Sequence, residues 1–463
     1  MGRVAVLFPP LAVSRDFIDY PYFADLGAVQ AAAVLAAHGH EVRLVDALAL
    51  AGADGIEQPG GRILLGAPID VEQLRATDLV VVAFTPFHRP PRRDPDLGNL
   101  LARVRAASAR RPIVLADLYQ SGQHYVEADP GLVLREYPEV DLLLRYEAEV
   151  SLPGLVDQLF RGRPDTARVE RGVEPDDLDL LPLPAWDRVD LPAYFSLHDR
   201  LMQGLGRPRW AFPIDERSLP LVTSRGCPFR CVHCSSNPGL VEGQPKKQRR
   251  KSRQRMAREL DFLASLGARR VHVLDELANV NERHFEDLLD LVVERELRLE
   301  IPNGLRADYV TDRHLSLLSR RATTLSVSAE SGVQRVVDEV VKKELDLARI
   351  TSVASELAPT TSRCWFTSCW GCRARPEPRS TRPLPSPRAC SSASARSRAF
   401  SMRRPCRARP WPGPCARCRS WKTGARVFNV SPAPRSNTPR PKSSPLSGEL
   451  SRIAWQRSEA PSA

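Results

Sequence analysis

The sequence predicts an α/β protein made of a parallel-sheet domain, a partial β/α barrel and a tail of different composition. Apolar runs of strand length alternate with amphipathic stretches of helical length over residues 1–150 and again over residues 218–357. This alternation is typical of parallel sheets whose faces are covered by helices. The longest apolar run, near Leu79–Phe84, is far shorter than the ~20 residues of a membrane-spanning helix, so we expect no association with a membrane.

Residues 1–150 predict a Rossmann-like parallel sheet. Its expected strands are Val4–Phe8, Val42–Val45, Leu79–Phe84, Ile113–Ala116 and Leu142–Leu144, and its expected helices are Leu26–His38 and Leu97–Ala109. Such sheets bind ligands beyond the carboxyl ends of their strands. Because Phe8-Pro9-Pro10 follows the first strand in place of a Gly-x-Gly-x-x-Gly turn, we do not expect a nicotinamide dinucleotide site.

Residues 151–217 predict a linker, and residues 218–357 predict half of a β/α barrel. The linker is expected to be ordered but irregular, because prolines recur in Leu178–Pro192 and restrict the residues before them. Four strand–helix units follow it. The expected strands are Leu219–Thr223, Arg270–Leu274, Leu297–Ile301 and Thr323–Val327, and the expected helices are Arg255–Ser265, Glu282–Glu294, Asp312–Arg320 and Val333–Val341.

Cys227, Cys231 and Cys234 form a C-x3-C-x2-C motif directly after the first barrel strand. Thiolates bind iron–sulfur clusters, usually four per cubane, so three on one loop leave one iron open to a further ligand. The alternatives are a zinc site with His233 as the fourth ligand, or ordinary buried thiols. The context favours the cluster, because the motif sits where β/α barrels place reacting groups and residues 1–360 hold no other cysteine.

The segment Ser224–Cys234 resembles the signature of the radical S-adenosylmethionine (SAM) superfamily. The resemblance implies a [4Fe–4S] cluster on the three cysteines and SAM bound at the open iron. Glu330-Ser331-Gly332 resembles the superfamily's Glu-Ser-Gly element, which implies that Glu330 contacts SAM. Further residues are expected around the cofactor, each with a structural role as the alternative. They are His233, which would pack against the cofactor, Asn303 and Arg306 after the third strand, and the acidic pair Asp275-Glu276.

Residues 1–150 resemble the cobalamin-binding domain that precedes the barrel in one branch of this superfamily. The resemblance is carried by Val4–Pro10, Gly39-His40-Glu41-Val42 and Val140–Glu149, and by the linker segment Leu180–Asp187. The chain departs from the branch in two respects. The Asp-x-His-x-x-Gly loop that supplies a histidine to cobalt is absent after the first strand, and Tyr146 stands where the branch usually has glycine. His40, the nearest histidine, is expected to be structural. Cobalamin is therefore a candidate cofactor rather than an implied one.

Residues 358–463 have a composition that predicts a disordered tail read out of frame. From Thr361 onward there are 21 Lys and Arg but only 3 Asp and Glu, whereas the rest of the chain has a net charge of −6. Only six Ile, Leu and Val occur there, too few to support a core. Cys369-x-x-Cys372 and Cys415-x-x-Cys418 also permit a zinc ribbon, and the basic charge permits nucleic-acid binding.

The genetic code favours the frameshift. Synonymous codons for Arg363–Glu377, read two bases later, can encode Leu-Leu-Val-His-Phe-Met-Leu followed by Gly-Leu-Pro-Gly-Glu. That segment resembles the fifth strand and glycine-rich turn of the same enzyme branch. We therefore expect a frameshift between Leu357 and Ser362, the loss of strands five and six, and an unpaired strand edge that impairs this chain.

The sequence as a whole predicts a radical SAM enzyme that generates a 5′-deoxyadenosyl radical, and a methyltransferase if cobalamin binds. The expected partners are a small-molecule or peptide substrate and an electron donor such as flavodoxin or ferredoxin, in the cytoplasm. Neither a membrane nor nucleic acid is expected as a partner, and no catalytic residue is predicted beyond the cofactor ligands. The alternative is a non-enzymatic, metal-containing binding module with a basic nucleic-acid-binding tail.

Overall fold

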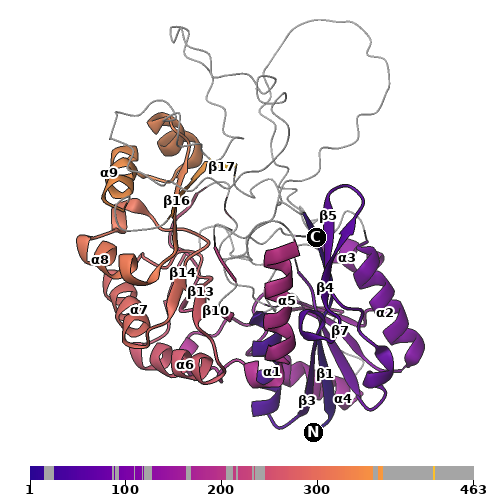
Figure 1. Cartoon of the computed structure of the whole chain (residues 1–463). Helices are drawn as coiled ribbons and strands as arrows, with labels where there is room; N and C mark the ends of the chain where they lie inside the picture. The colour runs from indigo at the N-terminus through magenta and orange to yellow at the C-terminus, as the bar shows by residue number, and fades with distance from the viewer. Residues whose placement is uncertain are drawn as a thin grey trace, which may run out of the picture. The chain divides into compact units, whose positions relative to one another are not determined.

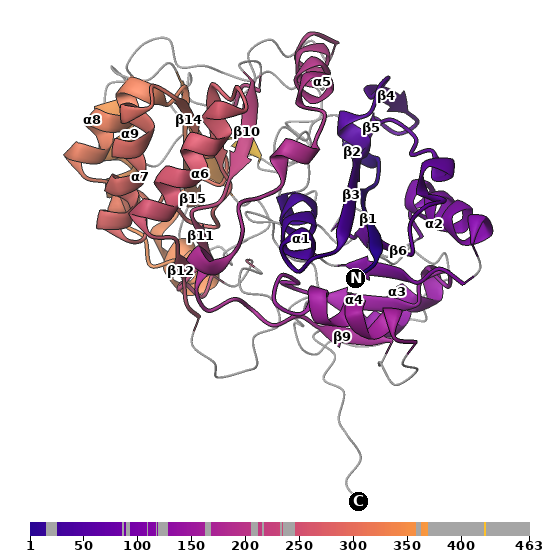
Figure 2. The same ribbon diagram turned by 90° about the horizontal axis from the view of Figure 1, so that it is seen from below.

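The computed structural model is drawn in Figures 1 and 2. It describes residues 1–14, 26–85, 88, 93–108, 110–116, 118, 128–162, 168–204, 212–214, 217–231, 234, 246–357, 363–368 and 421–422. Among these residues no helix is long and apolar enough to cross a membrane.

A six-stranded sheet with parallel pairing throughout forms the N-terminal part of the chain. In spatial order its strands are β3 (Glu41–Asp46), β1 (Arg3–Phe8), β6 (Leu79–Ala83), β7 (Ile113–Ala116), β8 (Leu142–Arg145) and β9 (Val169–Arg171). The five predicted strands are confirmed. The sixth, β9, falls in the predicted linker, so the sheet extends beyond residue 150.

Helices cover both faces of this sheet, as parallel strands require. They are α1 (Leu26–Ala37), α2 (Pro95–Ala107), α3 (Pro130–Glu136) and α4 (Leu152–Phe160). Alternate residues of β1 serve the two faces, because successive side chains in a strand point to opposite sides. Val4 and Val6 pack in one core with α1 and α4, whereas Ala5 and Leu7 pack in the other with α2 and α3. Figure 2 shows α1 and α2 on opposite sides of the strands.

Two regions that the sequence did not predict complete this part. A three-stranded antiparallel sheet has the order β2 (Leu11–Ser14), β5 (Arg62–Gly66), β4 (Asp54–Gln58). The linker contains the helix α5 (Leu191–Gly204). Trp186 of the linker, which precedes this helix, is fully buried. Its 3-10 turns at Leu178–Leu180 and Trp186–Arg188 agree with the irregular chain expected there.

The second part contains six strands that pair in parallel and follow one another along the chain. They are β10 (Ser218–Leu221), β13 (Arg270–Val273), β14 (Arg298–Glu300), β15 (Thr324–Glu330), β16 (Arg363–Ser368) and β17 (Trp421–Lys422). Isolated parallel bridges, Leu299 to Ala322 and Leu305 to Val327, connect the first three strands to the last three. The arrangement confirms the α/β class and the partial barrel.

The helices of this part lie along the outer side of its strands (Figure 1). They are α6 (Arg253–Ser265), α7 (Glu282–Glu294), α8 (Asp312–Arg321) and α9 (Leu347–Leu357). The predicted helix at Val333–Val341 is a π-helix at Val336–Val341. It ends at Lys342 in the left-handed region, with φ of 56°.

The expectation of an unpaired edge after the fourth barrel strand is wrong. β16 pairs in parallel with β15 from the Thr324–Arg363 pair to the Glu330–Ser368 pair. The reason lies in residue types, since Trp, Phe and Thr within Arg363–Ser368 favour extended chain. The frameshift stays a prediction. The predicted disorder and the four zinc-ribbon cysteines lie outside the described residues.

Candidate functional site

The three cysteines lie on one loop at the carboxyl end of β10. We call residues 226–234 the cysteine loop; it follows the short strand β11 (Ser224–Arg225). Cys227, Cys231 and Cys234 are thiols of intermediate exposure that are not in disulfides, and Cys234 N–H donates to Cys231 O at 3.2 Å. His233, the candidate fourth ligand and cofactor neighbour, lies outside the described residues.

The thiols are near enough to influence one another's ionisation. Burial raises the pKa of Cys227 to about 11, and Cys234 and Cys231 add to the shift because three thiolates repel. Burial also raises the pKa of Cys231, against the lowering effect of Lys343. Bound iron would supply the positive charge that such a thiolate set needs. The donor set therefore fits an iron–sulfur cluster.

The acidic pair after β13 supports the stem of the cysteine loop. Asp275 accepts hydrogen bonds from Thr223 N–H at 2.7 Å and from the hydroxyls of Thr223 and Ser224 at 2.6 Å each. Glu276 accepts from Gly226 N–H at 3.0 Å, and burial raises the pKa of Glu276 to about 7. Both carboxyl groups thus hold the chain that leads into Cys227.

Asn303 and Arg306 also contact the protein around the loop. Asn303 Nδ2 donates to Asp275 O at 2.9 Å. Arg306 pairs with Asp308 and donates to the carbonyls of Lys343 and Glu344 at 2.8 Å each. Because the guanidinium of Arg306 donates to groups of the chain itself, a structural role is favoured over a role in binding a cofactor.

Phe229 connects Arg306 to the cysteine loop. The Arg306 guanidinium carbon lies 3.9 Å from the centroid of the Phe229 ring, within the range of cation–π contacts. Through the carbonyl contacts of Arg306, the loop is therefore joined to the turn that follows the π-helix.

Glu330 ends β15 in a left-handed conformation, with φ of 62°. Lys343 Nζ donates to Glu330 Oε1 at 2.8 Å and to Ser328 O at 2.8 Å. Ser331 and Gly332 form the turn that follows, where Ser331 Oγ accepts from Val333 N–H at 3.2 Å. The charges of Glu330 and Lys343 both act on Cys231, so this ion pair lies beside the cysteine loop.

The sequence analysis missed Lys343. Lysine pairs after an amphipathic helical stretch are common on protein surfaces, so nothing in the local sequence distinguished it. Its role depends on the turn at Lys342 and on burial, since only 7% of Lys343 is exposed.

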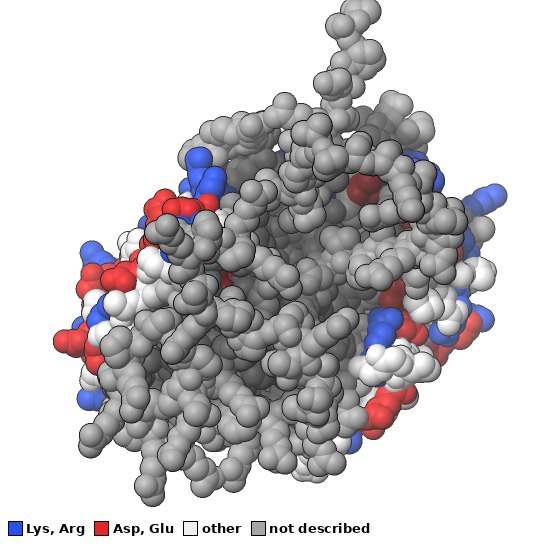
Figure 3. Space-filling view, turned by 90° about the horizontal axis from the view of Figure 1, so that it is seen from above, with Lys and Arg blue, Asp and Glu red and all other residues white. Residues whose placement is uncertain are grey.

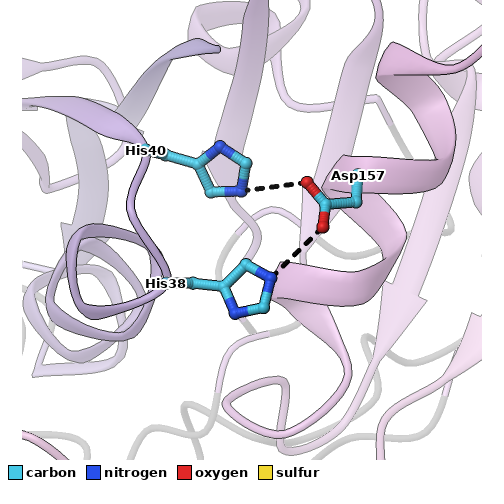
Figure 4. A group of neighbouring side chains, drawn as sticks. All are labelled: His38, His40 and Asp157. Atoms are coloured by element: carbon cyan, nitrogen blue, oxygen red, sulfur yellow. Dashed lines mark hydrogen bonds and ion pairs between the residues drawn. The ribbon is translucent and has the colours of Figure 1, made fainter. Parts of the chain in front are cut away.

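His40 lies at the end of the N-terminal sheet where the parallel strands begin, that is, at their amino ends. With His38 and Asp157 it forms what we call the histidine–aspartate trio (Figure 4). Nε2 of His38 lies 3.2 Å from Asp157 Oδ2, and Nε2 of His40 lies 3.6 Å from Asp157 Oδ1. Because β3 starts just after His40, the carboxyl ends of the parallel strands are at the other edge. His40 is therefore not placed to meet a ligand there.

The trio has donor types that metals use, but the hydrogen bond to His40 favours a neutral imidazole that faces Asp157. Gly2 N–H donates to His40 Nδ1 at 3.4 Å. A neutral imidazole that accepts at Nδ1 keeps its proton on Nε2, the atom that faces Asp157. The trio thus joins the turn before β3 to α4.

Tyr146 adopts the conformation that explains why glycine is usual at its position. Its φ is 63°, in the left-handed region that side chains rarely adopt. The guanidinium carbons of Arg145 and Arg171 lie 4.7 and 5.0 Å from the Tyr146 ring centroid. These two contacts hold the aromatic ring at the carboxyl end of β8.

Figure 3 shows the charged side chains of the described residues on one face of the molecule. Where residues are described on that face, Lys and Arg side chains are interspersed with Asp and Glu side chains. Backbone phosphate binding needs a basic stripe or patch instead.

The second part of the chain is similar to known proteins. Residues 221–358 match the family model of the Radical SAM superfamily. An uncharacterized methyltransferase of Synechocystis is 32% identical over 150 residues, which are 32% of this chain and 23% of that protein. Cytidylyl-2-hydroxyethylphosphonate methyltransferase of Streptomyces wedmorensis is 30% identical over 175 residues, 37% of this chain and 30% of that protein. The chain thus spans about a quarter to a third of these relatives.

A solved structure shares the fold over both parts. The radical SAM methyltransferase TsrM of Kitasatospora setae, with tryptophan and a SAM analogue bound, aligns with a TM-score of 0.55 and 14% identity. The alignment covers 80% of this chain and 67% of TsrM. A second TsrM structure, with cobalamin and a [4Fe–4S] cluster bound, aligns with a TM-score of 0.55 at 15% identity, over 80% of this chain and 69% of that one.

Proposed function

We propose that this chain, which carries a radical SAM domain over residues 221–358, is a radical SAM enzyme that methylates a small molecule. One observation carries the proposal: three thiols on a single loop, at the carboxyl end of a barrel strand, lie beside a buried ion pair of Glu330 and Lys343. The alternative of a non-enzymatic metal module does not account for that ion pair.

In this proposal the chain's own residues bind and orient two groups. Cys227, Cys231 and Cys234 hold a [4Fe–4S] cluster. Glu330 and Lys343 offer one anion and one cation, which complement the ammonium and carboxylate of the methionine end of SAM. The chemistry that the bound cluster supplies is the one-electron reductive cleavage of SAM. The barrel strands and the loop contact through Phe229 would exclude water from the reacting atoms.

Cobalamin is the proposed third cofactor. The support is the N-terminal parallel sheet, the methyltransferase names of the curated relatives, and the cobalamin in one TsrM structure. His40 lies at the other edge of the sheet, so it would not be the axial ligand. We further propose a reducing cytoplasmic location and flavodoxin or ferredoxin as the electron donor.

Anaerobic reconstitution tests the cluster assignment. We expect iron and sulfide in about a four-to-four ratio, a visible absorbance band, and SAM cleavage under a low-potential reductant. Cys231→Ala should abolish the band, whereas Cys364→Ala, outside the loop, should leave it. A single bound zinc with no iron would contradict the proposal and support the metal-module alternative. Hydroxocobalamin retained after gel filtration would support the third cofactor.

We also propose that the frame of the gene changes after Leu357. Sequencing from the codon for Ile350 to the codon for Arg375 tests it directly. One missing or extra base would make most of the last hundred residues an artefact of frame, and the restored chain should then be assayed. An unchanged frame in an expressed gene would make the basic tail a real extension.

A further inference from the structure

Two short strands that pair in antiparallel fashion flank the segment that contains the cysteine loop: β11 precedes it and a second strand, β12 (Arg249–Arg250), follows it. In the register of this pair, Arg225 stands opposite Arg249. Residues 226–248, including all three cysteines, lie between these two stems. Two arginines side by side repel each other, so the base of the loop requires a negative group.

Glu147 supplies that group for both stems at once. Its Oε2 accepts from Arg225 at 2.9 Å and from Arg249 at 3.0 Å, and its Oε1 also accepts from Arg249. Glu149 accepts a further bond from Arg225 at 2.7 Å. We call these four residues the arginine–glutamate network. Each is at least nine-tenths buried, and the four charges sum to zero.

The two glutamates come from a well-anchored part of the N-terminal sheet. They follow β8 directly, after Tyr146 with its two arginine contacts. Gly172 N–H donates to Arg145 O at 2.8 Å, and a Cβ on Gly172 would lie 1.9 Å from Glu147 O. The backbone around Glu147 therefore has no room to shift toward β9.

We propose that Glu147 is a positioning residue that fixes both stems of the cysteine loop, and so ties the placement of the three cysteines to the N-terminal sheet. The importance of the loop rests on the proposed function, but the contacts do not. With the carboxylate neutralised, Arg225 keeps only its ion pair with Glu149, and Arg249 keeps only the longer ion pair with the partly exposed Glu174 at 3.8 Å, which opens the base of the loop.

The same geometry predicts different effects for the two glutamates. Glu147 bonds to both arginines, whereas the bond from Glu149 reaches only Arg225. Loss of Glu147 should therefore loosen both stems, and loss of Glu149 only the first. A general loss of stability would not produce this asymmetry.

Hydrogen exchange of the full-length chain without added iron tests the inference independently of the proposed function. In Glu147→Gln we expect amide exchange to rise about tenfold in peptides covering residues 222–226 and 248–251. Glu149→Gln should raise it in the first peptide alone, and Glu147→Asp should restore most of the protection. Glu300→Gln changes a glutamate of another buried pair, with Arg270 at the start of β13, and serves as the control. Unchanged exchange in both stem peptides of Glu147→Gln would overturn the inference.

The reconstituted protein provides a second readout. We expect Glu147→Gln to hold less than about half the iron of the parent, or to shift the midpoint potential of its cluster, with Glu300→Gln unaffected in both. If the parent chain binds no cluster, the proposed function fails while the exchange result still stands. If the parent binds a cluster and Glu147→Gln matches it in iron and potential, the positioning role is refuted.

Discussion

Two groups of ionisable side chains join distant segments of this chain, and they differ in burial and in the type of cation. The arginine–glutamate network is buried and joins the N-terminal sheet to the cysteine loop. The histidine–aspartate trio joins two segments within the N-terminal sheet domain. Its His40 is buried, but the side chains of His38 and Asp157 are 47% and 29% exposed. Guanidinium stays charged at every working pH, whereas imidazole titrates near neutrality.

The comparison predicts which group controls the fold. Breaking a buried ion pair leaves an uncompensated charge in a medium that solvates it poorly, whereas water replaces the partner of an exposed pair. The network should therefore dominate stability and loop placement over a wide pH range. The trio should contribute little, and only where histidine titrates.

The largest expected effect is that of Arg249→Met. It keeps an unbranched side chain but removes the guanidinium, so Glu147 has only one of its arginines, and we expect the free energy of unfolding to fall by about 3 kcal/mol. Urea denaturation of the purified chain measures it. Arg3→Met is the matched control, because its partner Asp78 is 41% exposed and the pair is solvated. Equal losses in the two variants would remove the distinction between the buried and exposed groups.

The second-largest effect concerns the pH dependence of stability, which two buried carboxyl groups near the loop should change in opposite directions. Burial alone would raise the pKa of Glu147, but Arg225 and Arg249 outweigh it and hold the pKa below its usual value. Burial raises the pKa of Glu276 from 4.5 to about 7. Stability from Glu276 is thus complete below pH 4.5 and is lost as the pH rises to about 7, by roughly 3 kcal/mol.

Urea unfolding at several pH values between 5 and 8 checks the sign. We expect Glu276→Gln to flatten the decline in stability across this range, because its amide does not ionise. The contribution of Glu147 has the opposite sign, since a lowered pKa stabilises the fold at high pH. An unchanged pH dependence in Glu276→Gln would show that this carboxyl is already ionised in the folded chain.

Gly172→Ala tests whether a backbone change in the N-terminal sheet disturbs the arginine–glutamate network. The new methyl group would meet Glu147 O, so the backbone of Glu147 must move, at a cost of about 1–3 kcal/mol. We expect greater exchange at both loop stems, although no charge has changed. Gly154→Ala, with open space around its Cβ position, is the control. Stability loss without any change at the stems would show that the strand position does not reach the loop.

The sequence predicted strands with a continuous apolar run, such as β6, and strands with alternating apolar residues, such as β3 and β14. It missed β5, despite its apolar residues, and β4, which has few. Leu79–Ala83 is buried at every position, and its apolar run is unmistakable. In Asp54–Gln58 no residue is buried, so β4 has no such pattern. β9 was likewise missed, because none of its three residues is buried and its pairing with β8 is not visible in the local sequence.

The residues of the candidate site also differ in whether the local sequence could predict them. The cysteines were predictable because their spacing on one loop already constrains the chemistry. Glu147 was visible only as part of a resemblance, and its partner Arg225 lies 78 residues away. Lys343 depends on a left-handed turn after a π-helix. Long-range pairing and backbone geometry of this kind arise from the tertiary fold.

The smallest expected effect is that of Asp157→Asn. The amide keeps a hydrogen bond to the exposed His38 but loses the ion pair, so at pH 8 we expect the melting temperature to change by no more than about 2 °C. Burial lowers the pKa of His40 against the pull of Asp157, so stability from neutral His40 is complete above about pH 6.5 and is lost as the pH falls. Asp157→Asn removes that pull, so the loss should steepen below pH 6.5, as melting curves at pH 5.5 and 8 can measure. A large loss at pH 8 would mean that the trio, like the network, behaves as a buried charge cluster.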